Sequence, residues 1–126
     1  MTAFVPPGWP PGVQPPGADG FLRTAASWLF DHCPPDFRGH DVLRRHPPLL
    51  ARLAVEQLAA AVDACRQGYR TARADLREQL PTEVLDALIA AYEKEGRRLA
   101  AAHRAALLLQ RAIAGERFTP TLGSSR

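Results

Sequence analysis

The sequence predicts an all-α protein built on a long antiparallel helical hairpin of the coiled-coil type. Apolar residues recur every seven positions on both sides of Pro81, which is the spacing of helices that pack along one seam. The repeat consists of Val55, Val62, Tyr69 and Leu76 before Pro81, and of Leu85, Tyr92, Leu99, Ala106 and Ile113 after it. Folding the chain back at Pro81 brings Val62 level with Leu99 and Tyr69 level with Tyr92. A short N-terminal helix that packs on the hairpin and a proline-rich extended N-terminal arm complete the predicted fold.

Residues 1–18 form the proline-rich arm. They contain three Pro-Pro-Gly units at irregular spacing, so the three-residue period of collagen is absent. Such a segment forms polyproline II or turn structure without a core of its own. Because apolar residues are interleaved with the prolines, we expect the arm to lay Trp9 on the helical body. The alternative is a free proline-rich ligand for a partner's aromatic groove, with Trp9, Pro10 and Pro11 as its contact residues.

A single helical domain is expected over residues 19–118, and it begins with a short helix at about 20–32. The apolar face of this helix is formed by Phe21, Ala25, Trp28 and Leu29. Asp19 is placed to cap its start. Cys33 ends it, because a residue that precedes proline disfavours helical geometry. A proline-containing loop and one helical turn at 41–45 lead to the hairpin.

The two long helices are expected at about 48–79 and 82–114. Pro48 suits the first turn of a helix, where its missing amide donor has no cost. Pro81 either starts the last helix at its first position or kinks one continuous rod within a dimer. Gly115 is expected to end that helix in a left-handed conformation. Residues 119–126 are expected to form a flexible tail.

Two arginine-rich surfaces differ in the acidic residues that oppose them. The first is a stripe on the second helix, formed by Arg66, Arg70, Arg73 and Arg77. Acidic residues crowd the facing half of the last helix, and we expect Arg70 to pair with Glu93 and Arg77 with Asp86. The stripe is therefore interpreted as structural.

The second surface, which we call the basic pole, lies at the opposite end of the hairpin. It consists of Arg44, Arg45, Arg52, Arg104, Arg111 and Arg117. Only Glu56 and Glu116 oppose these arginines, so we expect little internal neutralisation. Solvated charge is the simplest interpretation, and the basic pole is the first place to look for an anionic partner.

The sequence contains no pattern that indicates catalysis, a metal or a cofactor. Six potential ligands lie within fifteen residues, at His32, Cys33, Asp36, His40, Asp41 and His46. They lack the close pairs typical of zinc sites, and the two cysteines are too far apart in the chain to form such a pair. No phosphate-binding glycine loop or nucleophile elbow is present. No signal peptide or membrane-spanning stretch is evident, so we expect a cytoplasmic protein that is not an enzyme.

Five segments of the chain carry a resemblance to a known family. They are FVPPGWPPGVQPPG at 4–17, WLFDHCPPDFR at 28–38, VLRRHP at 42–47, RQGYRTAR at 66–73 and YEKEG at 92–96. The chain resembles a family of small actinobacterial helical proteins with an N-terminal Pro-Pro-Gly-rich arm. That family has no established function, so the resemblance implies no activity and no functional residues.

These observations predict a non-catalytic protein-interaction or assembly module, as a monomer or a homodimer. Binding is expected through the arm, the region of Trp9 and Trp28, or the basic pole. The alternative is a nucleic-acid-associated accessory protein that binds through the basic pole. A steep loss of DNA affinity with salt would distinguish this alternative, because phosphate contacts release counterions.

Overall fold

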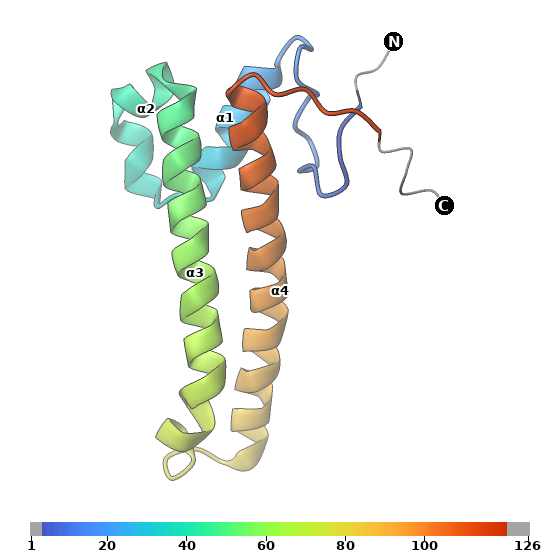
Figure 1. The fold of residues 1–126 in the computed structure, drawn as a ribbon. Helices are drawn as coiled ribbons and strands as arrows, with labels where there is room; N and C mark the ends of the chain where they lie inside the picture. The colour runs from blue at the N-terminus through green and yellow to red at the C-terminus, as the bar shows by residue number, and fades with distance from the viewer. Residues whose placement is uncertain (1–3, 121–126) are drawn as a thin grey trace.

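A computed structural model describes residues 4–120, and all the regular secondary structure within them is helical. Its elements are α1 (Phe21–Asp31), η1 (Pro35–Gly39), α2 (Asp41–Arg45), α3 (Pro47–Leu76) and α4 (Thr82–Ile113). Helices α3 and α4 run side by side in opposite directions, and the chain reverses between them (Figure 1). The predicted all-α hairpin is confirmed, and Pro81 belongs to a turn rather than to a kinked rod. None of the described helices has the length and apolarity needed to cross a membrane.

The ends of the long helices follow from local hydrogen bonding. Helix α3 ends at Leu76, three residues before the predicted end at 79, because the next residues form a turn in which Gln79 and Leu80 donate to the Leu76 carbonyl. Pro81 is the N-cap of α4 and not its first helical residue, which corrects the predicted position. Gly115 has a φ of 104° and ends α4 as predicted. Its amide donates to the Ala112 carbonyl, and the Glu116 amide donates to that of Arg111.

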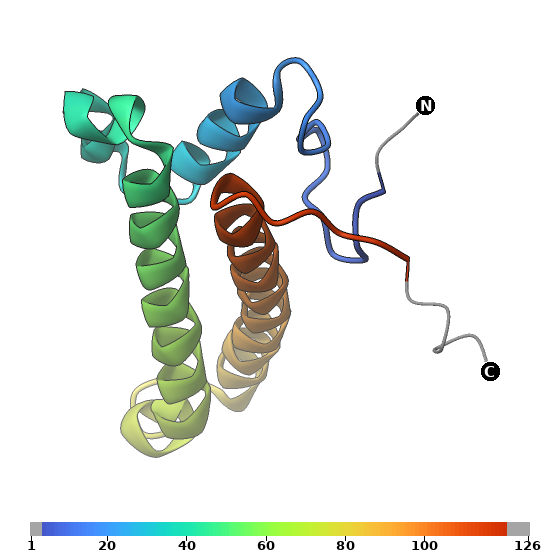
Figure 2. The same ribbon diagram turned by 45° about the horizontal axis from the view of Figure 1, so that its top comes forward.

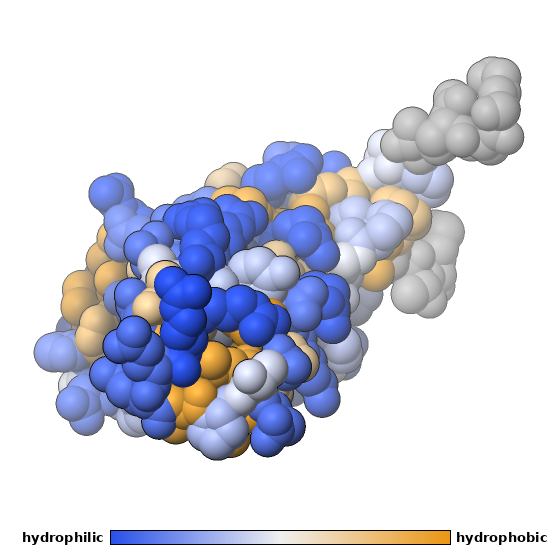
Figure 3. All heavy atoms as spheres, turned by 90° about the horizontal axis from the view of Figure 1, so that it is seen from below, coloured by the Kyte–Doolittle hydropathy of each residue, from blue (hydrophilic) through white to orange (hydrophobic). Residues whose placement is uncertain are grey.

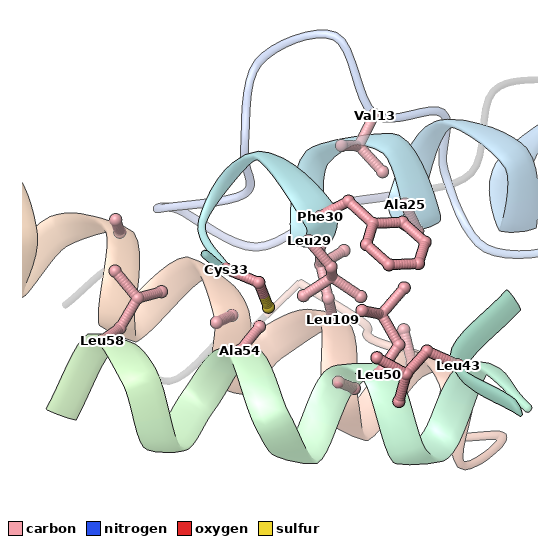
Figure 4. Packing of buried hydrophobic residues seen from close by; sticks show 14 of the residues in the cluster. Val13, Ala25, Leu29, Phe30, Cys33, Leu43, Leu50, Ala54, Leu58 and Leu109 are labelled. Atoms are coloured by element: carbon pink, nitrogen blue, oxygen red, sulfur yellow. The ribbon is translucent and has the colours of Figure 1, made fainter. Parts of the chain in front are cut away.

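The main core lies where α1 crosses the α3 and α4 ends that are remote from the turn (Figures 1 and 2). Leu29, Leu50 and Leu109 come from three different helices and are fully buried there (Figure 4). Buried alanines such as Ala54 and Ala106 let the helices approach closely. Toward the turn, α3 and α4 pack only on each other, and the buried residues there are confined to their seam.

The proline-rich arm is a chain of tight turns that packs on the helical body. Trp9, Val13 and Ala18 each donate a backbone hydrogen bond to the proline three residues earlier. The glycine before each of them has a φ between 82° and 90°, as the third position of a type II turn requires. The Trp9 ring lies 6.1 Å from that of Phe21 and 6.0 Å from that of Phe118, and Trp9 Nε1 donates to the Val13 carbonyl at 2.9 Å.

The start of α1 differs from the prediction. Asp19 does not cap the helix, because the N-cap is Gly20, which has a φ of 83° and no side-chain cap. Thr24 organises this end from within the helix. Its hydroxyl donates to the Gly20 carbonyl at 2.7 Å and accepts a hydrogen bond from the Gln14 amide at 3.0 Å, which ties the arm to α1. Of the predicted tail, residues 121–126 lie outside the described part of the chain.

Candidate functional site

An open groove runs between α3 and α4, on the part of the hairpin that α1 does not cross. Its larger part has a volume of about 410 Å³. The lining residues are Val62, Cys65, Arg66, Tyr69 and Arg70 from α3, with Tyr92, Glu93, Gly96, Arg97 and Ala100 from α4. Apolar side chains form the floor, and charged side chains form the rim. Apolar surface framed by hydrophilic side chains is also exposed at the turn end of the hairpin (Figure 3).

A second hollow, of about 260 Å³, continues this groove toward the remote ends of the two helices. The two share Val62, Arg66 and Ala100, so they form one continuous surface, which we call the central groove. The second hollow adds Ala59, Asp63, His103 and Arg104 to the lining. From Ala59 to Arg70 the groove follows α3 for about 16 Å, or three helical turns.

Two glycines inside the long helices differ in what surrounds them. A Cβ atom at Gly68 would lie 2.3 Å from Cζ of Tyr92, so this glycine lets the Tyr92 ring pack directly against α3. A Cβ atom at Gly96 would meet nothing within 4 Å. A glycine in a helix interior costs about 1 kcal/mol of stability relative to alanine. The contact with Tyr92 accounts for that cost at Gly68, whereas no contact inside the described structure accounts for it at Gly96.

Tyr69 and Tyr92 lie level with each other along the hairpin, as predicted, but their side chains are placed differently. The Tyr92 ring occupies the space above Gly68, whereas the Tyr69 side chain lines the groove and is 45% exposed. Heptad spacing places both tyrosines near the seam but does not show which ring fills it. The two glycines, each inside a predicted helix, were the sequence signal for this site.

The arginine stripe is less neutralised than its sequence predicts. Asp86 pairs with Arg73 at 3.0 Å rather than with Arg77, and this is the ion pair that joins α3 to α4 in the described structure. Arg70 does not pair with Glu93, because its guanidinium donates to Gln67 Oε1 at 2.9 Å. Both Arg70 and Arg66 instead lie on the rim of the central groove.

The basic pole, in contrast, is partly neutralised within the fold. Arg45 lies 2.7 Å from Asp41 and Arg52 lies 3.5 Å from Glu56, each one helical turn away. Arg111 pairs with Glu116, and this contact lowers the pKa of the Glu116 carboxyl. The expectation of little internal neutralisation is therefore wrong for half of the pole. Arg104 lines the central groove, while Arg44 and Arg117 have no carboxylate partner among the described residues.

The predicted contact residues of the arm are held against the body. Pro10 is fully buried and Trp9 is half-buried within the aromatic contacts described above, whereas Pro11 is exposed. A free polyproline ligand would present all three residues to a partner. In the structure the arm is therefore docked on the helical body and is not a free ligand.

The connector between α1 and α3 contains the six potential metal ligands considered in the sequence. Within residues 4–120, no three His, Cys, Asp or Glu residues are grouped to hold a metal ion. The His32 ring lies 4.2 Å from that of Trp28. Burial, and then the nearby Arg98, lower the pKa of His32, although Asp31 opposes this change. Burial also raises the pKa of the Cys33 thiol, which disfavours its reactive thiolate form.

Lowering the pH through the ordinary His32 value of 6.5 is expected to destabilise the fold. The unfolded chain takes up this proton near pH 6.5, whereas the folded chain does so only at lower pH, so the stability from neutral His32 is lost as pH falls. The free energy of unfolding, measured by urea titration between pH 7.5 and 5.5, should therefore fall less in His32→Gln than in the parent. If the free energy of unfolding changed equally with pH in both proteins, His32 would not be the group responsible. Glu95 and Glu116, with pKa values below their ordinary 4.5, act only in more acidic solution.

The central groove combines an apolar floor, an arginine-rich rim and a length of about three helical turns. These are the features with which proteins bind an amphipathic helix from a partner.

A comparison with protein-family models, curated proteins and solved structures finds no match to this chain.

Proposed function

We propose that this protein is a non-catalytic helical interaction module that binds a segment of a partner protein in the central groove. The observation that carries the proposal is the open apolar surface between α3 and α4, lined by Val62, Tyr69 and Tyr92. An apolar groove rimmed by polar residues is a typical site for another protein to dock.

The remote half of the hairpin offers a precedent within the same chain. There α1 buries Phe21, Ala25 and Leu29 on α3 and α4, so these two helices already bind a third one. The half that contains the central groove has no third helix in the described structure. A partner helix would therefore complete in one half of the hairpin what α1 completes in the other.

The nucleic-acid alternative has weaker support. Three of the six arginines of the basic pole already pair with carboxylates, so fewer charges are free to replace phosphate counterions. The arm also has weaker support as a partner site, because Trp9 and Pro10 are engaged by the body. We therefore assign the central groove as the main binding surface.

Site-specific photocrosslinking in cells of the source organism tests this proposal. Benzoylphenylalanine replaces Tyr69 in one variant and Phe4 in a matched control, since both are aromatic residues with similar exposure, 45% and 39%. We expect a discrete protein adduct from position 69 and none from position 4. Adducts only from position 4 would move the site to the arm. A nucleic-acid adduct, or no adduct from position 69, would contradict an interaction module that uses the central groove.

A further inference from the structure

Gly96 marks the point at which an outside group can approach α4 most closely. It lies in the middle of the helix and lines the central groove, and the space that its side chain would occupy is open. At Gly68, on the neighbouring helix, the absence of a side chain is explained within the chain itself, because the Tyr92 ring occupies that space. Small residues at a helix surface allow another helix backbone to come close. The open space at Gly96 therefore fits a neighbour that the chain itself does not supply.

The rim of the central groove carries an excess of positive charge. Two carboxylates line it, those of Asp63 and Glu93. Four arginines line it as well, namely Arg66, Arg70, Arg97 and Arg104. Asp63 lies 3.9 Å from Arg66, a loose contact between exposed groups. Arg97 has no carboxylate within 4 Å among the described residues. Acidic groups on a partner would complement this rim.

We infer that the occupant of the central groove is an acidic amphipathic helix of about three turns, whose small or apolar stripe crosses α4 at Gly96. This inference rests on the proposed function and adds the chemistry of the partner. A second copy of the chain, docked groove to groove about a twofold axis, would place arginine rims against each other. Like charges opposed in this way disfavour such a dimer.

Selection from a defined peptide library tests the charge of the partner. The library consists of eighteen-residue helices presented on phage, with a fixed stripe of alanine and leucine and randomised flanking positions. The intact chain is the target of the selection. We expect the selected sequences to be enriched in aspartate and glutamate at the flanks. Enrichment of neutral or basic flanks, or no enrichment, would overturn the inference. If position 69 still forms a protein adduct in cells, the interaction module itself would stand.

Three variants then locate the binding of the selected acidic peptide, measured by fluorescence anisotropy. Arg97→Glu should weaken binding about tenfold or more, because it places a carboxylate opposite the acidic flank. Arg44→Glu makes the same charge change in the basic pole, and binding should stay within about twofold. Gly96→Ala should raise the melting temperature of the free chain by about 4 °C, because alanine favours the helix. It should still weaken peptide binding about tenfold, because the added methyl group fills the space at the crossing point. Equal losses for Arg44→Glu and Arg97→Glu, or unchanged binding by Gly96→Ala, would contradict this placement.

Nucleic acid provides the competing outcome for the same arginines. A 20-base-pair DNA duplex is titrated in parallel at two salt concentrations. We expect it to compete poorly with the acidic peptide. Duplex binding that is stronger than peptide binding, falls steeply with salt and is lost in Arg97→Glu would assign the rim to phosphate and overturn the inference.

Discussion

Replacing Leu109 by alanine is expected to lower the free energy of unfolding by about 3 kcal/mol. Leu109 is fully buried on α4, where it meets Leu29 of α1 and Leu50 of α3 (Figure 4). Its truncation removes apolar contacts with two other helices at once. It also leaves a cavity, because three crossing helices cannot all move inward to fill the space. Urea denaturation followed by helical circular dichroism measures the loss.

Leu107→Ala is the matched control for this prediction. The change is chemically identical and lies two residues away on the same helix, but the Leu107 side chain is 37% exposed. Its loss should stay below about 1 kcal/mol, because less apolar surface returns to water. Similar losses for both variants, or a loss below about 1 kcal/mol for Leu109→Ala, would show that α1 does not seal the core at this position.

The hairpin could be predicted from the sequence because its signal is repeated along some sixty residues. Each heptad indicates the same face, so errors at single positions do not change the result. The position of the main core could not be predicted in the same way. Leu99 and Ala106 are consecutive members of the same seven-residue repeat in α4, but only Ala106 is fully buried. Periodicity identifies the apolar face of a helix and not which part of it a third helix covers.

The ion pairs were mispredicted because counting residues from the turn does not give the exact register between two helices. Arg77 is the C-cap of α3 and keeps helical φ and ψ, so it still continues the arginine stripe. Asp86 nevertheless pairs with Arg73, one helical turn earlier. Arg70 donates to Gln67 within its own helix rather than to Glu93. An error of one helical turn in register is thus enough to change which residues pair.

The central groove itself depends on one side chain that periodicity cannot orient. With Tyr92 and Tyr69 both in the seam, the two rings would fill the space between α3 and α4 and little groove would remain. Gly68 allows the Tyr92 ring to pack directly against α3, and the Tyr69 side chain lines the groove and remains exposed. The glycine at position 68, inside a predicted helix, is the sequence feature that allows this arrangement.

Replacing Trp9 by alanine is expected to lower the free energy of unfolding by about 2 kcal/mol, although Trp9 belongs to a segment without regular secondary structure. The indole contacts the rings of both Phe21 and Phe118 and donates to the Val13 carbonyl. Fully buried tryptophans cost about 3–5 kcal/mol on truncation, and Trp9 is half-buried, so we expect a smaller loss. Thermal and urea denaturation of the full chain measure it.

A double-mutant cycle between Trp9 and Phe118 shows whether the two ends of the chain stabilise each other. The edge-to-face contact of their rings should give a coupling free energy of about 1 kcal/mol between Trp9→Ala and Phe118→Ala. The same cycle with Trp28→Ala in place of Trp9→Ala should be additive, because the Trp28 ring contacts His32 instead. Additivity in the Trp9 cycle would mean that the arm and the C-terminal segment pack on the body independently. Coupling would make the arm part of the folded domain, because Trp9 and Phe118 both pack against the main core.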